Sequence, residues 1–152
     1  MRSDFWRITL VAITGMATAV FLVTAQAADM TPADTASSLI AKGGQQWEAG
    51  NLGDAQKDFE RAVKADPRSI SAHMKLGGLQ LSRNNFNDSI QAYQRVIGID
   101  PKNVLAWIGL GISYLHTGRN ELSRAAFEEV VRIDPGRKEQ LASVMAKLSA
   151  PD

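Results

Sequence analysis

The sequence predicts an all-α protein, an α-solenoid of three helical hairpins followed by a C-terminal capping helix. Two observations lead to this prediction. An Asp-Pro dipeptide ends at Pro67, Pro101 and Pro135, so successive prolines are 34 residues apart. Between them, apolar residues follow one another at spacings of three and four, the period of an amphipathic helix. A fixed period of this length is typical of stacked units that bury their apolar faces against one another.

Other positions repeat with the same period. An aromatic residue stands eight positions before each proline, as Phe59, Tyr93 and Phe127. A glycine stands 24 positions before each proline, as Gly43, Gly77 and Gly111. Residue types that tolerate a left-handed helix end stand 17 positions before, as Gly50, Asn84 and Gly118. Each unit is therefore expected to hold two helices joined by a turn, with small residues where the helices approach closely.

The third unit carries a family resemblance. Its Trp107-x-x-Leu110-Gly111-x-x-Tyr114, followed by Phe127 and Pro135, resembles the signature of the tetratricopeptide repeat. The second unit has His73 and Gln80 where the signature has its Trp and Tyr, and the first unit departs further. The resemblance covers three units, residues 36–69, 70–103 and 104–137. It implies a module for protein–protein interaction rather than an enzyme.

The segments beside the array predict its two ends. Residues 28–35 form a short lead-in, in which Thr31 and Asp34 resemble a helix cap and the first helix starts at Pro32. Residues 138–152 form a capping helix and tail with one apolar stripe, made of Leu141, Val144, Met145 and Leu148. We expect this helix to cover the exposed side of the third hairpin. The alternative is a segment that docks on another molecule.

Residues 1–27 read as a signal peptide. Arg2 and Arg7 precede an apolar stretch from Ile8 to Val23, and small residues precede the expected cleavage before Ala28. Cleavage would release a periplasmic or secreted protein. The alternative is a membrane anchor, since Asp4 weakens the positive start and the apolar stretch is long for a signal peptide, although shorter than the ~20 residues of a transmembrane helix.

Charge and composition exclude several classes of function. The chain has a formal net charge of +1, and beyond residue 27 its basic and acidic residues balance, so nothing favours nucleic acid or an anionic membrane as partner. Membrane contact is expected only if the leader is uncleaved. The absence of cysteine excludes disulfides, thiolate metal sites and a thiol nucleophile.

The residues also offer little for catalysis. His73 and His116 lie in different units, so a shared metal site is not expected, and we predict no cofactor, no metal and no enzyme activity. His73 fits a partly buried core position, and His116 lies near a helix C-terminus. Two groups of charged residues fit solvated outer faces of helices: Glu128 with Glu129, and Asp58 with Glu60 and Arg61.

The resemblance implies a superhelix whose concave wall comes mostly from the first helix of each unit. The predicted partner-binding groove comprises Ile40, Trp47, Met74, Lys75, Leu81, Leu105, Ile108, Ile112, Leu115 and His116. Domains of this family that grip a C-terminal carboxylate use five polar residues on this wall. The matching positions are Ile40, Gly44, Lys75, Leu105 and Gly109. Only one cation remains, so we do not expect that class of ligand.

Three uses remain open for the apolar residues of this wall. Ile108, Ile112 and Leu115 could pack against the capping helix, bind a partner, or contact a second copy of the chain. Trp47 fits packing against the neighbouring hairpin better than stacking on a ligand. The function predicted is an exported, periplasmic adaptor that binds an apolar peptide or helix of an envelope protein. The alternative is a scaffold that associates with itself, a homo-oligomer.

Overall fold

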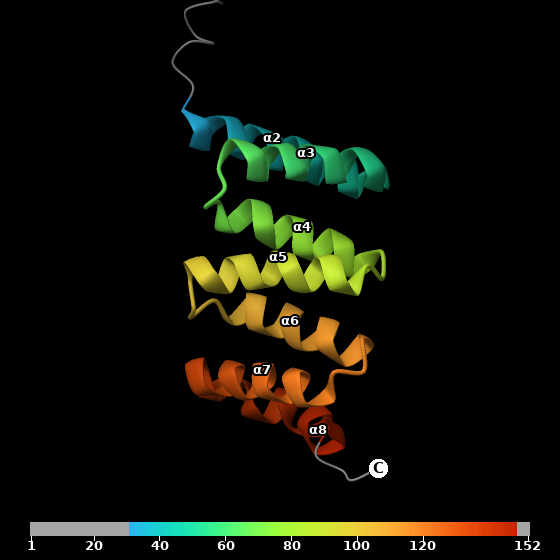
Figure 1. The fold of residues 1–152 in the computed structure, drawn as a ribbon, viewed down its shortest axis with the longest axis vertical. Coiled ribbons are helices and arrows are strands. Elements are labelled where there is room, and N and C mark those ends of the chain that lie inside the picture. The colour runs from blue at the N-terminus through green and yellow to red at the C-terminus, as the bar shows by residue number, and fades with distance from the viewer. Residues whose placement is uncertain (1–30, 149–152) are drawn as a thin grey trace, which may run out of the picture.

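The computed structural model describes residues 31–148, and within this part of the chain it contains seven α-helices and no strand. The helices are α2 (Pro32–Glu48), α3 (Leu52–Ala65), α4 (Ile70–Ser82), α5 (Phe86–Ile99), α6 (Val104–His116), α7 (Asn120–Ile133) and α8 (Lys138–Leu148), with a 3-10 turn, η1 (Pro135–Arg137), before α8. They stack in chain order along one axis (Figure 1). The all-α fold class is confirmed. The leader and its predicted cleavage lie outside the described residues.

Three antiparallel pairs, α2–α3, α4–α5 and α6–α7, form the hairpins. The turn inside each pair contains the one residue with positive φ that the sequence predicts. These residues are Gly50 at 80°, Asn84 at 61° and Gly118 at 70°. The first helix begins as predicted, because the Thr31 side chain accepts from the Asp34 backbone N–H and Asp34 caps Thr31 in return. None of the helices within residues 31–148 is both long and apolar enough to cross a bilayer.

Asn84 is the one described non-glycine residue with a left-handed backbone. We expect Asn84→Ala to destabilise the protein by about 1 kcal/mol. In a left-handed backbone the Cβ comes too close to the following carbonyl oxygen, and alanine lacks the short polar side chain that lets asparagine tolerate this conformation. Asn84→Gly, the residue that Gly50 and Gly118 supply at the equivalent positions, should keep or raise the stability. Urea unfolding of both variants checks this. Equal losses for alanine and glycine would contradict it.

The repeated glycines lie where an aromatic ring presses on the first helix of the same hairpin. A Cβ added at Gly43 would lie 2.6 Å from the ring of Phe59, one at Gly111 would lie 2.7 Å from Phe127, and one at Gly77 would lie 3.0 Å from Tyr93. These rings are buried. The close approach predicted from the 34-residue period is therefore present in all three hairpins.

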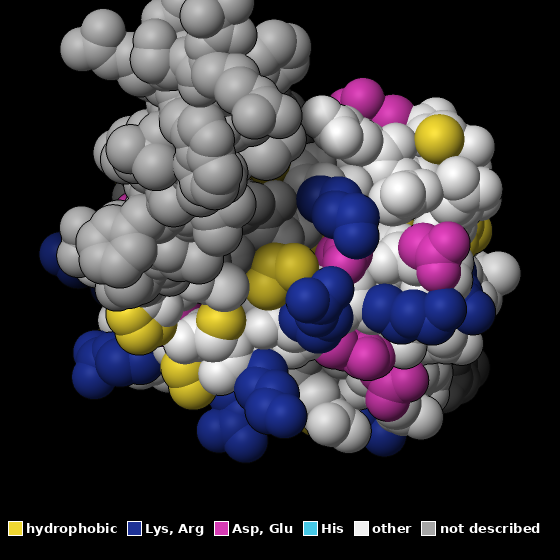
Figure 2. All heavy atoms as spheres, turned by 90° about the horizontal axis from the view of Figure 1, so that it is seen from above, with side chains coloured by type: hydrophobic (Ala, Val, Ile, Leu, Met, Phe, Trp, Pro, Cys, Tyr) yellow, Lys and Arg dark blue, Asp and Glu magenta, His cyan; other side chains and the backbone are white. Residues whose placement is uncertain are grey.

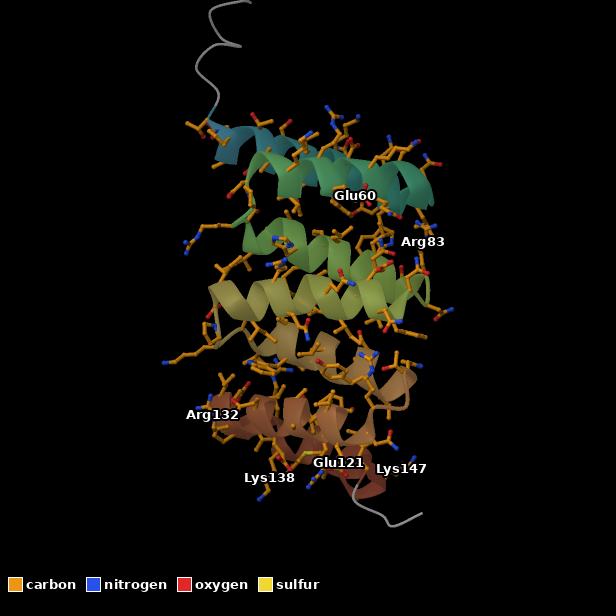
Figure 3. The ribbon with its side chains drawn as sticks, in the orientation of Figure 1. Glu60, Arg83, Glu121, Arg132, Lys138 and Lys147 are labelled. Atoms are coloured by element: carbon orange, nitrogen blue, oxygen red, sulfur yellow. The ribbon has the colours of Figure 1, made fainter. Side chains whose placement is uncertain are left out.

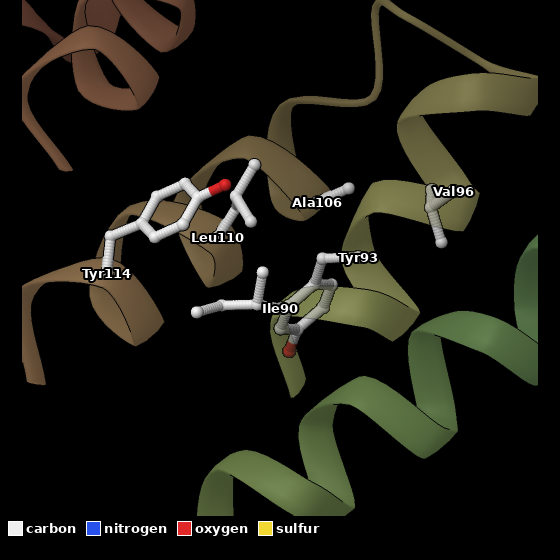
Figure 4. Packing of buried hydrophobic residues seen from close by; sticks show 6 residues of the cluster. All are labelled: Ile90, Tyr93, Val96, Ala106, Leu110 and Tyr114. Carbon is white, nitrogen blue, oxygen red and sulfur yellow. The ribbon is translucent and has the colours of Figure 1, made fainter. Parts of the chain in front are cut away.

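Tyr93 also joins two hairpins. Its ring points from α5 toward α4, away from Leu110 and Tyr114 of the same apolar cluster (Figure 4). On its other side it covers Gly109 of α6, where an added Cβ would lie only 2.3 Å from the ring. Tyr93 is thus held between Gly77 and Gly109, and burial raises the pKa of its hydroxyl.

The first helices of the hairpins approach one another more closely than the second helices do. Cα atoms of α2 and α4, and of α4 and α6, come within 8 Å, whereas no such pair joins α3 with α5 or α5 with α7. A stack whose helices are closer on one side curves toward that side. The face formed by α2, α4 and α6 is therefore the concave one, as the resemblance implies.

The capping helix α8 packs on α7, with its apolar stripe half-buried and its polar side exposed. No Cα of α8 lies within 8 Å of a Cα of α6. It therefore continues the stack at its end and does not fold back over the concave side of the third hairpin.

One charged residue is placed differently from the prediction. Asp58, expected on a solvated outer face, is 4% exposed. Its carboxylate accepts from Lys42 of the neighbouring helix at 3.4 Å and from Arg61 at 3.3 Å. The prediction was wrong because Asp58 lies on the side of its helix that packs against the other helix of the hairpin. The charge pattern alone does not distinguish this side from a side exposed to solvent.

Candidate functional site

The ten predicted groove residues come from the three helices of the concave face. Ile40 and Trp47 belong to α2; Met74, Lys75 and Leu81 to α4; and Leu105, Ile108, Ile112, Leu115 and His116 to α6. Their exposure differs along the array. The structure places them on one side of the stack, where Lys75, Leu105, Leu115 and His116 are exposed and the other six are half-buried.

The concave side of α6 carries an apolar row. Leu105 is 60% exposed and Leu115 is 36% exposed, while Ile108 and Ile112 are half-buried. Leu105 and Leu115 are two of the large apolar residues most open to solvent among residues 31–148. Since α8 does not approach α6, this row is not the packing surface of the capping helix.

Two other predicted groove residues take part in the core. Ile40 packs against a buried cluster of Ala36, Ala62 and Ala72. Met74 packs against the cluster that contains Tyr93 and Leu110. Their half-buried side chains therefore present only an edge to the groove, and a partner would gain less contact from them than from Leu105.

Trp47 lies at the other end of the concave face. Its ring meets Phe59 edge-on, with centroids 6.2 Å apart, and would lie 3.3 Å from a Cβ at Gly78 in the next hairpin. The predicted packing against the neighbouring hairpin is confirmed. With Glu48, Lys75 and Gly44 it also lines a hollow of about 350 Å³. Within residues 31–148, neither Glu48 nor Lys75 has an ion-pair partner.

Each histidine has a packing role. His73 is 6% exposed, and its Nε2 donates to the Pro67 carbonyl oxygen at 3.0 Å. This bond matches that of Trp107, whose Nε1 donates to the Pro101 carbonyl oxygen at 2.8 Å. His116 ends α6 and stacks on Phe86, with ring centroids 4.6 Å apart and planes 2° from parallel. The sequence does not predict this stacking, because Phe86 lies 30 residues away in another hairpin.

Charges of both signs are mixed over the described surface. Seen from the α2 end, the basic side chains lie among acidic ones where the face is not grey (Figure 2). Several form pairs one helical turn apart, such as Lys57 with Asp54 at 2.9 Å. This pair lowers the pKa of Asp54 and raises that of Lys57. Within residues 31–148, no cluster of His, Asp and Glu could hold a metal ion.

Two hollows that the sequence does not predict lie on the opposite face. One lies over α4 between α3 and α5, and the other lies over α6 between α5 and α7. No local pattern predicts them, because their lining residues come from three helices each, and Trp107, Leu110 and Tyr114 occupy signature positions assigned to packing.

Comparison with known proteins supports the fold. The family model described as tetratricopeptide repeat matches residues 41–104 and 79–138, about two thirds of the chain together. The chain belongs to the tetratricopeptide repeat family. Its units depart from the family signature most in the first hairpin, where Gly43 and Phe59 are kept but the large residues of the first helix are not.

Solved structures of this family resemble the chain. The second tetratricopeptide domain of human RPAP3, in complex with the HSP70 peptide SGPTIEEVD, has 19% identity and a TM-score of 0.72, covering 79% of this chain and 99% of that one. The Arabidopsis OM64 domain has 17% identity and a TM-score of 0.71, covering 78% and 97%. MamA has 26% identity and a TM-score of 0.64, covering 74% and 64%. A search of curated proteins finds no match.

Proposed function

We propose that this protein is an exported adaptor that holds an apolar peptide or helix of an envelope protein in its concave groove, with no covalent step. The observation that carries the proposal is the open apolar row of α6, above all Leu105 at 60% exposure. When a partner covers an apolar side chain this open to water, the complex is stabilised by about 25 cal/mol per Å² of apolar surface buried. Export is inferred from the leader sequence.

The related domains of RPAP3 support a peptide as partner, since two of them are bound to the chaperone peptides SRMEEVD and SGPTIEEVD. The chemistry of the groove differs from a carboxylate clamp. Of the five matching positions, Gly44 and Gly109 offer no side chain, Ile40 is half-buried in the core and Leu105 is apolar. An apolar segment is therefore the better fit than an acidic C-terminus.

The proposal predicts that Leu105→Asp weakens partner binding at least about tenfold, equivalent to ~1.4 kcal/mol. Photo-crosslinking from position 115 in intact cells, followed by mass spectrometry, should yield one partner whose crosslinked segment is apolar. That crosslink should be much weaker in Leu105→Asp. Leu122→Asp is the matched control, because Leu122 is 50% exposed on the opposite face. Equal crosslinking in wild type and Leu105→Asp would refute the groove assignment.

The same experiment separates the second candidate, self-association. The α6 row of one copy could be covered by another copy of the chain in a heterologous contact. In that case position 115 crosslinks to the protein itself, and light scattering shows a mass that rises with concentration and falls in Leu105→Asp. A monomer at every concentration removes this candidate.

A further inference from the structure

The two hollows on the convex side are copies of one position in the repeat. The first hollow lies between α3 and α5, and the second lies between α5 and α7. All but one of the residues that line the second hollow stand 34 positions after a residue that lines the first. Their volumes are similar, about 400 and 350 Å³. Glu121 and Arg132 mark the two ends of α7, the outer wall of the second hollow (Figure 3). We call this second hollow the outer groove.

The chemistry of the two hollows is different. In the first, the equivalent positions are polar, with His73, Asp88 and Gln91. The outer groove has Trp107, Leu122 and Ala125 in their places. Trp107 packs against the core cluster that contains Leu110. At the positions of Leu122 and Ala125, however, the same fold accepts polar residues one unit earlier, so packing of the hairpins does not require apolar residues there. Leu122 is 50% exposed and lines the groove together with Trp107 and Ala125, so it is part of an apolar patch and not an isolated exposed residue.

One polar pair lies within this apolar lining. The Gln94 Nε2 donates to the Tyr114 hydroxyl oxygen at 3.0 Å. Tyr114 is 8% exposed, and within residues 31–148 neither its hydroxyl proton nor the Gln94 Oε1 has a hydrogen-bond partner. The pair therefore offers one donor and one acceptor side by side. In the first hollow, Gln80 stands at the position equivalent to Tyr114, and its Oε1 accepts a hydrogen bond from Asn85 Nδ2 at 2.8 Å.

The charges of the lining are of one sign. Glu128 and Glu129 line the outer groove, and no cation is among its lining residues. Their arginine partners, Arg124 at 3.6 Å and Arg132 at 2.7 Å, lie outside it. The first hollow, by contrast, includes Arg95 in its lining. A basic group next to the apolar part of a ligand would thus be attracted to this groove.

We propose that the outer groove binds an extended peptide segment with two neighbouring apolar side chains and a basic residue beside them. A cavity of 150 Å³ holds one benzene ring, so about 400 Å³ accepts two apolar side chains. The donor and acceptor of Tyr114 and Gln94 match the N–H and C=O of an extended backbone. A helix uses these groups internally, so it would leave the pair without partners.

This site is independent of the concave groove. It lies on the other face of α6, with Trp107 and Tyr114 in place of Leu105 and Leu115. Either site can exist without the other. Variants at Leu105 and Leu122 separate them, because each residue is exposed and belongs to only one of the two faces.

The test begins with the full chain and a phage-displayed library of random short peptides. Peptides selected on wild type should carry two apolar residues and a Lys or Arg. Their affinity should fall at least about tenfold in Leu122→Asp and in Ala125→Gln. Both replacements are the residues found at the same positions one unit earlier, Asp88 and Gln91, so the fold accepts them. Tyr114→Phe should lower the affinity severalfold, and so should methylation of the peptide backbone nitrogens.

The reverse change provides a gain of function. In Asp88→Leu with Gln91→Ala and Arg95→Glu, the first hollow takes the apolar and acidic lining of the outer groove at three exposed positions. The same peptides should then bind at a second site, severalfold more weakly because the pair of Tyr114 and Gln94 has no counterpart there. Titration calorimetry should then show a raised stoichiometry, while circular dichroism should show an unchanged helix content. Leu105→Asp is the control and should leave the binding unchanged.

Two results would overturn the proposal. One is a selection that returns no peptide whose binding depends on Leu122 and Ala125. The other is a set of peptides that bind as helices, or whose binding is lost in Leu105→Asp, since these would belong to the concave groove. Leu122→Asp or Ala125→Gln could lower the stability of the fold together with the affinity for the peptide. The gain-of-function variant then decides between the two causes, because it adds binding without removing any core residue.

Discussion

Gly109→Ala is expected to destabilise the protein by about 1–3 kcal/mol, although alanine is the better helix former. The added Cβ would lie 2.3 Å from Cζ of the Tyr93 ring. The ring has little room to move away, because it also lies so close to α4 that a Cβ added at Gly77 would be 3.0 Å from its Cε1. The ring is 5% exposed and links the second hairpin to the third. Urea unfolding of wild type and variant measures the loss.

Gly98→Ala is the matched control. Gly98 lies exposed in α5, and a Cβ there would meet nothing within 4 Å. The same replacement should therefore stabilise the protein by about 0.5–1 kcal/mol. Opposite signs for the two variants would show that the ring contact decides the effect. A loss of stability in Gly98→Ala, or none in Gly109→Ala, would contradict the packing described for Tyr93.

The repeat itself was predictable from the sequence, because its marks are local. Proline after the second helix, a left-handed turn residue and a glycine under an aromatic ring each follow from one residue type at one position. The role of Gly109, by contrast, could not be predicted from local marks. It lies outside the repeated glycine positions, and its role depends on the reach of the Tyr93 ring from another hairpin.

The candidate sites were predictable only in part. The apolar row of α6 follows from helical spacing together with the family's geometry, although its exposure depends on where α8 packs. The burial of Asp58 and the stacking of His116 on Phe86 depend on contacts between helices. The outer groove joins residues of α5, α6 and α7, and it becomes visible in the sequence only when equivalent positions of two units are compared for polarity.

Phe59→Ala should have the largest effect of the variants considered, a loss of about 3–5 kcal/mol. Phe59 is fully buried, with Ala55 and Leu79 in the same cluster and Trp47 against its edge. Its removal leaves a cavity between the first and second hairpins. Phe86→Ala is the control, since Phe86 is only half-buried and should cost clearly less.

The location of the loss is as informative as its size. No Cα of α2 or α3 comes within 8 Å of α5, α6 or α7, so the first hairpin meets the rest of the array through α4. In a stack of units that contact only their neighbours, a weakened terminal unit opens by itself. Hydrogen exchange in Phe59→Ala should therefore speed up in α2 and α3 while α6 and α7 keep their protection. Equal acceleration in all helices would mean that the array unfolds as one unit, and the concave row of α6 would then lose its shape together with the first hairpin.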